Sequence, residues 1–192
     1  SLAALARTSE RASDVRIVWN IRMPRVLAAL LAGAGLSLSG LIMQTVLGNA
    51  MASPSTLGVS NAAVFGANLS ILAFSGGFVS TGNNLQNYAA GINPYAASLT
   101  AFAFSMLSAL LVLGLCTRRA FSPGVVVLAG VAMGSVWTAG TTLLQFYATD
   151  VGLSAAVIWN FGDLGRATYR TDAIMAAVVL PSAAFFCLMA WR

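Results

Sequence analysis

The sequence contains no histidine, and its two cysteines, Cys116 and Cys187, have no C-x-x-C or metal-ligand spacing. Without histidine the chain cannot form a Ser/His/Asp or Cys/His catalytic set, a histidine metal site or an H-E-x-x-H motif. It also has no GxxxxGK[ST] loop for binding ATP. We therefore predict that it is not an enzyme, and we predict no catalytic residue, no metal ligand and no cofactor.

Charge is also scarce, because only 8% of the 192 residues are charged and 58% are hydrophobic, with a mean hydropathy of +0.83. A soluble domain usually has about a quarter of its residues charged. The chain is therefore expected to lie in a lipid bilayer. The sequence pI is near 10.0, but the arginines flank apolar segments and form no patch with interleaved aromatics. This distribution favours lipid headgroups over nucleic acid as the partner.

Five apolar segments have the length of membrane-spanning helices, each with roughly 18 to 23 residues and no charge. They are Val26–Val46, Leu57–Phe74, Tyr95–Leu115, Val125–Tyr147 and Ala173–Trp191. The sequence thus predicts an all-α, polytopic transmembrane helix bundle of about five spans. A proline at position 181 predicts a kink in the last span, because proline removes a backbone donor.

Small residues recur at intervals of four within two of these segments. They are Gly58, Ala62 and Gly66, and Gly130 and Gly134. This spacing places them on one face of a helix, where their size allows a second helix to approach closely. We interpret them as packing residues of a helix bundle.

Four amide side chains lie within the apolar segments, namely Gln44, Asn61, Asn68 and Gln145. They are either partners in hydrogen bonds between helices or parts of a weakly polar translocation path. The residues alone leave both alternatives open. Gln44 is the strongest path candidate, because it lies near the end of the first segment.

Arg22 and Arg25 stand on either side of Pro24, directly before the first apolar segment. They could anchor a helix end at the membrane surface, with Pro24 in the first turn where its missing N–H costs little. Alternatively, they could dock an acidic partner, since arginine binds carboxylates in a bidentate manner.

Four stretches resemble, in the same order, the FecCD family of membrane permeases from bacterial importers driven by ATP hydrolysis. They are R-x-P-R followed by a small-residue helix ending in Gln, LGVSN after a proline-containing loop, VLAGVAMGSVWTAGTTLLQFYATD, and IWNFGDLGRATYRTD. The resemblance covers Val18 to about Arg192. The sequence differs from the family at Asn49–Pro54, where a proline and an acid are missing, and at Trp159–Gly162.

The family has about ten spans, so the resemblance implies that this chain corresponds to helices two to six of a partial or truncated permease. Residues 1–25 would then be an arginine-rich segment ending at the outer membrane face, and 26–192 the partial permease domain. A short helix within Gly152–Asp163 would lie at the same face. Counting arginines on each side favours the opposite orientation, with seven against three. We follow the family, because the absent first helix normally dominates orientation.

The resemblance also implies a function and partners. The chain would be a permease subunit in the bacterial cytoplasmic (inner) membrane that imports iron siderophores, heme or cobalamin. It would pair as a homodimer or with a second permease, bind cytoplasmic ATPase subunits, and dock a periplasmic or lipid-anchored substrate-binding protein through Arg22 and Arg25. The alternative from another class is a small five-span membrane scaffold or assembly protein without transport activity.

Overall fold

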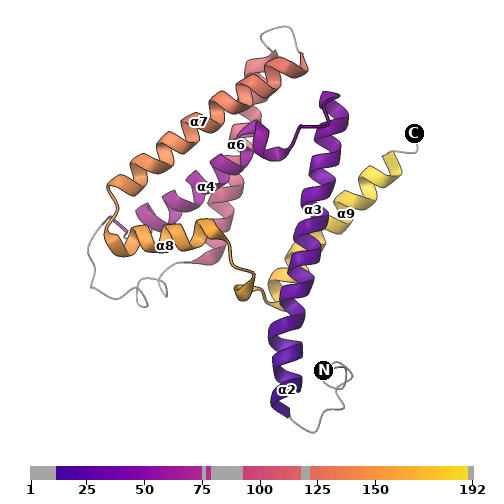
Figure 1. The fold of residues 1–192 in the computed structure, drawn as a ribbon, viewed down its shortest axis with the longest axis vertical. Helices are drawn as coiled ribbons and strands as arrows, with labels where there is room; N and C mark the ends of the chain where they lie inside the picture. Colours follow the sequence, from indigo (N-terminus) through magenta and orange to yellow (C-terminus); the bar gives the residue numbers. More distant parts are fainter. Residues whose placement is uncertain (1–11, 75–76, 79–92, 118–121, 190–192) are drawn as a thin grey trace. The chain divides into compact units, whose positions relative to one another are not determined.

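The computed structural model describes residues 12–74, 77–78, 93–117 and 122–189, and these residues are helical with no β-strand among them (Figure 1). The predicted all-α fold is therefore confirmed. The chain divides into two compact units, Ser1–Leu41 with Asp163–Arg192, and Ile42–Gly162. We call them unit 1 and unit 2 and describe each by itself.

The N-terminal part of unit 1 is one long helix. Its elements are α2 (Ala12–Ile17), the π-helical turn η1 (Val18–Arg22) and α3 (Met23–Leu47), whose last residues belong to unit 2. The predicted first span began at Val26, so the helix starts well upstream of the expected position. The predicted boundary between residues 25 and 26 lies inside this helix, and its relation to a membrane face stays a prediction.

Pro24 is buried in the interior of this helix and does not start it. The N–H of Met23 donates to the carbonyl of Val18, five residues back, which is the bond of a π-turn. A proline ring clashes with the carbonyl four residues back and provides no N–H. A wider turn directly before Pro24 explains how the helix passes through the R-x-P-R sequence without ending.

The rest of unit 1 is the short 3₁₀ turn η4 (Leu164–Arg166) and the helix α9 (Tyr169–Met189), which contains Pro181. The Tyr169 hydroxyl donates to the backbone carbonyl of Trp19. Farther along, a Cβ on Gly35 would lie 3.3 Å from Val179 Cγ2, so α3 and α9 approach closely there.

Unit 2 is a helix bundle arranged around α4 (Val59–Leu69). The helix α4 follows the 3₁₀ turn η2 (Pro54–Leu57) and continues into the π-helical turn η3 (Ser70–Phe74). It packs against α6 (Pro94–Thr117) and α7 (Pro123–Phe146), while α8 (Asp150–Phe161) contacts η3.

The core of unit 2 has two apolar clusters near opposite ends of α6. One contains Val112 and Cys116 of α6, and the other contains Ala97 of α6 with Ile71 and Leu72 of η3. Between them, the rings of Phe65, Phe104 and Trp137 pack with centroids 5.1 to 5.6 Å apart, and the Trp137 indole N–H donates to Ser108 Oγ at 3.0 Å.

Four helices among the described residues are long and apolar enough to cross a membrane, Ile17–Leu47, Tyr95–Thr117, Pro123–Phe146 and Tyr169–Met189. Four of the five predicted spans thus correspond to helices of membrane-spanning length in the part of the chain that the structure describes. The second predicted span, Leu57–Phe74, forms the apolar helix Val59–Phe74 of fewer than 18 residues. Its first predicted residue belongs to η2 and Gly58 has left-handed geometry (φ 69°), which delays the helix start.

Candidate functional site

The predicted small-residue positions of unit 2 lie where backbones meet. A Cβ on Gly58 would be 2.7 Å from the backbone nitrogen of Gly134 and 2.9 Å from the carbonyl oxygen of Gly130. A Cβ on Gly130 would be 2.5 Å from the carbonyl oxygen of Thr56 and 2.6 Å from the Cα of Leu57. Side chains do not tolerate such distances, so only glycine permits this contact between η2 and α7.

The same face of α4 contacts α6. A Cβ on Gly66 would lie 2.5 Å from the carbonyl oxygen of Thr100, and Ala62 is fully buried one turn earlier. The glycines of α4 and α7 thus set the distances between the three central helices of unit 2.

Two of the four predicted amide residues bind each other inside unit 2. Gln145 Nε2 donates to Asn68 Oδ1 at 3.1 Å, and Asn68 Nδ2 donates to Val64 O at 2.7 Å and to Asn160 Oδ1 at 2.9 Å. Asn68 has no exposed surface. Its amide therefore joins α4, α7 and α8 in one network, in which each of its own polar groups is used.

The other two amides lie at the surface of unit 2. Asn61 is exposed and donates to the carbonyl of Gly134 at 3.2 Å, and the side chain of Gln44 is exposed near the end of α3. The structure thus separates the four residues into a hydrogen-bonded pair, with Asn68 buried and Gln145 half-buried, and two exposed residues that are not brought together with it.

Arg22 and Arg25 are both exposed on the long helix of unit 1. The guanidinium Nη2 of Arg25 donates to the carbonyl of Gly165 at 3.5 Å, a contact between residues 140 positions apart in the sequence. Arg25 therefore lies beside η4, whose position next to it was not predicted.

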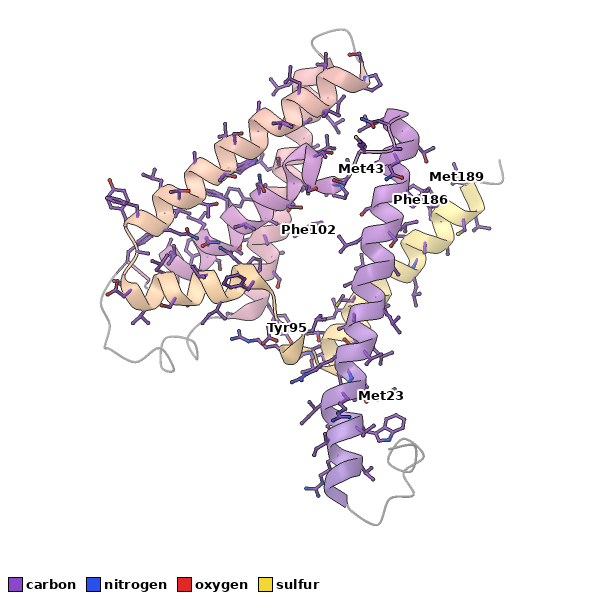
Figure 2. All side chains as sticks on the ribbon, viewed as in Figure 1. Met23, Met43, Tyr95, Phe102, Phe186 and Met189 are labelled. Atoms are coloured by element: carbon purple, nitrogen blue, oxygen red, sulfur yellow. The ribbon has the colours of Figure 1, made fainter. Side chains whose placement is uncertain are left out.

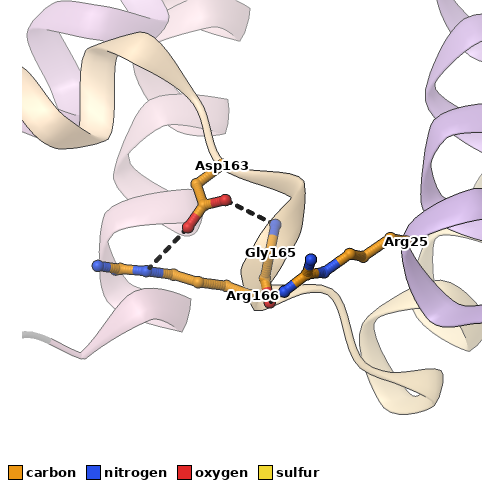
Figure 3. A network of polar contacts seen from close by, with 4 residues as sticks. All are labelled: Arg25, Asp163, Gly165 and Arg166. Carbon is orange, nitrogen blue, oxygen red and sulfur yellow. Dashed lines mark hydrogen bonds and ion pairs between the residues drawn. The ribbon is translucent and has the colours of Figure 1, made fainter. Parts of the chain in front are cut away.

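Figure 3 shows how this turn is built around Asp163. Its Oδ1 accepts the N–H of Gly165 at 2.6 Å, and its Oδ2 lies 3.8 Å from Nε of Arg166. Both side chains of the ion pair are largely exposed, at 55% for Asp163 and 71% for Arg166. The D-x-G sequence after Gly162 is typical of such an Asx turn and was the signal available for it.

Asp172 is a second residue that the sequence did not single out. It lies in the first turn of α9 with 5% of its surface exposed, and among the described residues neither carboxylate oxygen has a hydrogen-bond partner. Its sequence position beside Arg170 and before an apolar run looks like an ordinary helix start, so burial could not be predicted.

The long helices present apolar side chains at the surface of the chain. Phe102 on α6 and Met189 at the end of α9 are 63% and 52% exposed (Figure 2). The described residues contain no group of three His, Cys, Asp or Glu side chains that could hold a metal ion.

Residues 2–192 match the FecCD transport family. The chain belongs to this family. Among FecCD relatives, a candidate ABC transporter permease of Methanocaldococcus jannaschii is 44% identical over 176 residues, which cover 91% of this chain and 49% of that protein. The vitamin B12 import system permease protein BtuC of Escherichia coli K12 is 36% identical over 162 residues, covering 84% of this chain and 45% of BtuC.

A solved structure also resembles this chain in fold. A candidate metal-chelate type ABC transporter in an inward-facing conformation superposes with a TM-score of 0.77, at 22% identity over 96% of this chain and 54% of that one. At this identity the likeness concerns the fold alone. The chain spans about half the length of the curated FecCD relatives that it matches.

Proposed function

We propose that this chain is part of the permease subunit of an ATP-driven importer that carries metal chelates of the siderophore, heme or cobalamin class. Membership in the FecCD transport family, with relatives named as permeases, is the observation that supports this function. The permease works in a bacterial cytoplasmic membrane as a homodimer or paired with a second permease. Separate ATPase subunits hydrolyse ATP, and the four long apolar helices form part of the membrane domain.

Arg22 and Arg25 dock the acidic face of a substrate-binding protein in this proposal. Their exposure supports the role, and so does the continuous helix through Pro24, because a helix that passes the R-x-P-R sequence does not need these arginines to mark its end. Charge pairs between such surfaces steer the encounter and fix the register of docking.

For the translocation path, Gln44 remains the strongest candidate, and its exposure brings Asn61 forward as the second. Their side chains are exposed in this chain, whereas the buried Asn68 and the half-buried Gln145 bind each other within unit 2. A path residue must meet passing cargo or water. Asn68 and Gln145 join the path only if their mutual bond opens during transport.

Charge reversal tests the docking role most directly. We expect the Arg22→Glu/Arg25→Glu permease, reconstituted with its ATPase in lipid nanodiscs, to lose binding of its substrate-binding protein, because like charges at a close contact cost several kcal/mol. Lysine at both positions should weaken binding less, since the charge is retained and the bidentate fork is lost. Binding is measured by surface plasmon resonance at low and high salt.

Arg16→Glu is the control for these charge reversals, because Arg16 is an exposed arginine on the same long helix. The control should bind normally. Unchanged binding by the double glutamate variant would reject the docking role.

Uptake of labelled ferric siderophore, heme and cobalamin by the complete transporter identifies the cargo, and failure to transport any chelate would favour the membrane scaffold.

A further inference from the structure

The orientation of the Arg25 side chain depends on a segment far away in the sequence. Its Nη2 donates to the Gly165 carbonyl, and both residues belong to unit 1. A guanidinium has five N–H donors in a planar fork, so one bond to a fixed carbonyl restricts the plane of the fork and leaves donors for a carboxylate. The position of the Gly165 carbonyl therefore affects the direction from which a carboxylate can bind the Arg25 guanidinium.

Asp163 determines the local shape of the chain at Gly165. Its Oδ1 accepts the Gly165 N–H at 2.6 Å, and the turn closes with a bond from the Ala167 N–H to the Leu164 carbonyl at 3.1 Å. A Cβ on Gly165 would lie 2.7 Å from Asp163 Oδ1. The Asp163 carboxylate therefore occupies the space that a side chain at position 165 would need, and any residue other than glycine there would displace it.

The same carboxylate holds a further cation at this turn. Asp163 Oδ2 lies 3.8 Å from Nε of Arg166. An ion pair this exposed contributes little to stability, because solvent screens it. Arg166 therefore stays available to a partner, and the three exposed arginines at positions 22, 25 and 166 outnumber Asp163, the acid at this turn.

We propose that Asp163 is a positioning residue of an acid-binding surface formed by Arg22, Arg25 and Arg166. It shapes the Leu164–Arg166 turn so that the Gly165 carbonyl orients Arg25, and Arg166 belongs to the same turn. The partner is a protein face that presents carboxylates. This inference rests on the proposed docking function and adds to it a second chain segment, an additional cation and the residue that arranges them.

Asp163 is itself an acid on a surface proposed to bind acids, so its charge and its positioning role predict opposite effects when it is replaced. If Asp163 acted through charge alone, removing its charge would tighten binding of an acidic probe whichever residue replaced it. If it acts by positioning, Asp163→Asn retains an oxygen that accepts the Gly165 N–H, whereas Asp163→Ala does not. The two variants should then differ although both are neutral.

The probe is a fluorescein-labelled hexaglutamate peptide, titrated by anisotropy at low salt against the complete permease in nanodiscs, with hexalysine as the control peptide. We expect Asp163→Ala to bind about fivefold more weakly, the size of one lost hydrogen bond. Asp163→Asn should bind as tightly as the unaltered protein or more tightly. Arg166→Gln should bind more weakly and show a smaller salt dependence.

A double-variant cycle tests whether Asp163 acts through Arg25. Arg25→Ala/Asp163→Ala should bind no more weakly than Arg25→Ala alone, because a positioning residue has nothing left to position. Equal binding of the Ala and Asn variants at 163, at or above the level of the unaltered protein, would overturn the proposal while leaving docking by Arg25 intact. If Arg25→Glu also leaves peptide binding unchanged, the docking function itself fails.

Discussion

Several helix glycines of the two units differ sharply in their surroundings. In unit 2, a Cβ added to Gly58, Gly66 or Gly130 would meet backbone atoms at 2.5 to 2.9 Å. In unit 1, a Cβ added to Gly33 or Gly40 would meet nothing within 4 Å. The same sequence feature, a small residue within an apolar segment, thus accompanies backbone contact at these three positions of unit 2 and an uncovered helix surface at these two positions of unit 1.

Buried polar groups show a parallel difference. The buried amide of Asn68 in unit 2 has partners for its oxygen and its nitrogen, whereas the buried carboxylate of Asp172 in unit 1 has none among the described residues. The long helices differ in the same direction. In the most apolar 18-residue stretch of α6 and of α7, 22% of the stretch is buried, whereas the share is 6% in the long N-terminal helix and in α9. Among the described residues, unit 2 therefore buries more of its apolar helix surface than unit 1 does, and its buried amide is hydrogen-bonded whereas the buried carboxylate of unit 1 is not.

Alanine at the contacting glycines should produce the largest effect. Gly66→Ala and Gly130→Ala force two backbones apart. We expect each to lower the free energy of unfolding by about 3 kcal/mol or more, at the upper end of overpacking effects. Gly33→Ala and Gly40→Ala are the matched controls and should be neutral or stabilising by up to about 1 kcal/mol, because alanine favours the helix. Thermal unfolding in detergent measures all four. Equal losses at the contacting and the uncovered glycines would remove the distinction between the units.

Removing the central amide of unit 2 should have an intermediate effect. Asn68→Ala removes the hydrogen-bond partner of Gln145 and of Asn160. We expect the free energy of unfolding to fall by about 1 kcal/mol, which exceeds the average of about 0.6 kcal/mol for a hydrogen bond between transmembrane helices. Gln145→Ala in the same background should then cost little more. A thermal-unfolding cycle of the two single variants and the double variant measures the coupling, and strictly additive losses would contradict a shared network.

Neutralising the buried acid of unit 1 should give the smallest change, with the opposite sign. Asp172→Asn removes a charge that has no partner, so we expect a thermal midpoint about 2 °C higher. Asp150→Asn is the control, because Asp150 is an exposed acid in the first turn of α8. That change should lower the midpoint slightly, since an acid is favourable at a helix N-terminus. A lower midpoint for Asp172→Asn would show that the carboxylate has an important partner in the protein.

The sequence predicted the helices more accurately where proline or polar residues flank the apolar run. The predicted third and fourth spans differ from α6 and α7 by one or two residues at each end, because Pro94 and Pro123 each stand in the first turn of a helix. The first span was misplaced at its start for the opposite reason. Pro24 looked like a helix start, and a π-turn, which no sequence pattern announced, carried the helix through it.

Composition and spacing by themselves determined that this is an apolar, all-helical chain, and the order of its motifs pointed to the FecCD family. These properties depend on which residues are present and on their periodicity along one helix. Only the tertiary structure decided that Asn68 binds Gln145, 77 residues away, and that Arg25 lies beside Gly165, 140 residues away. Helix periodicity specifies the faces of single helices, whereas the choice of which faces meet depends on packing between segments that are distant in the sequence.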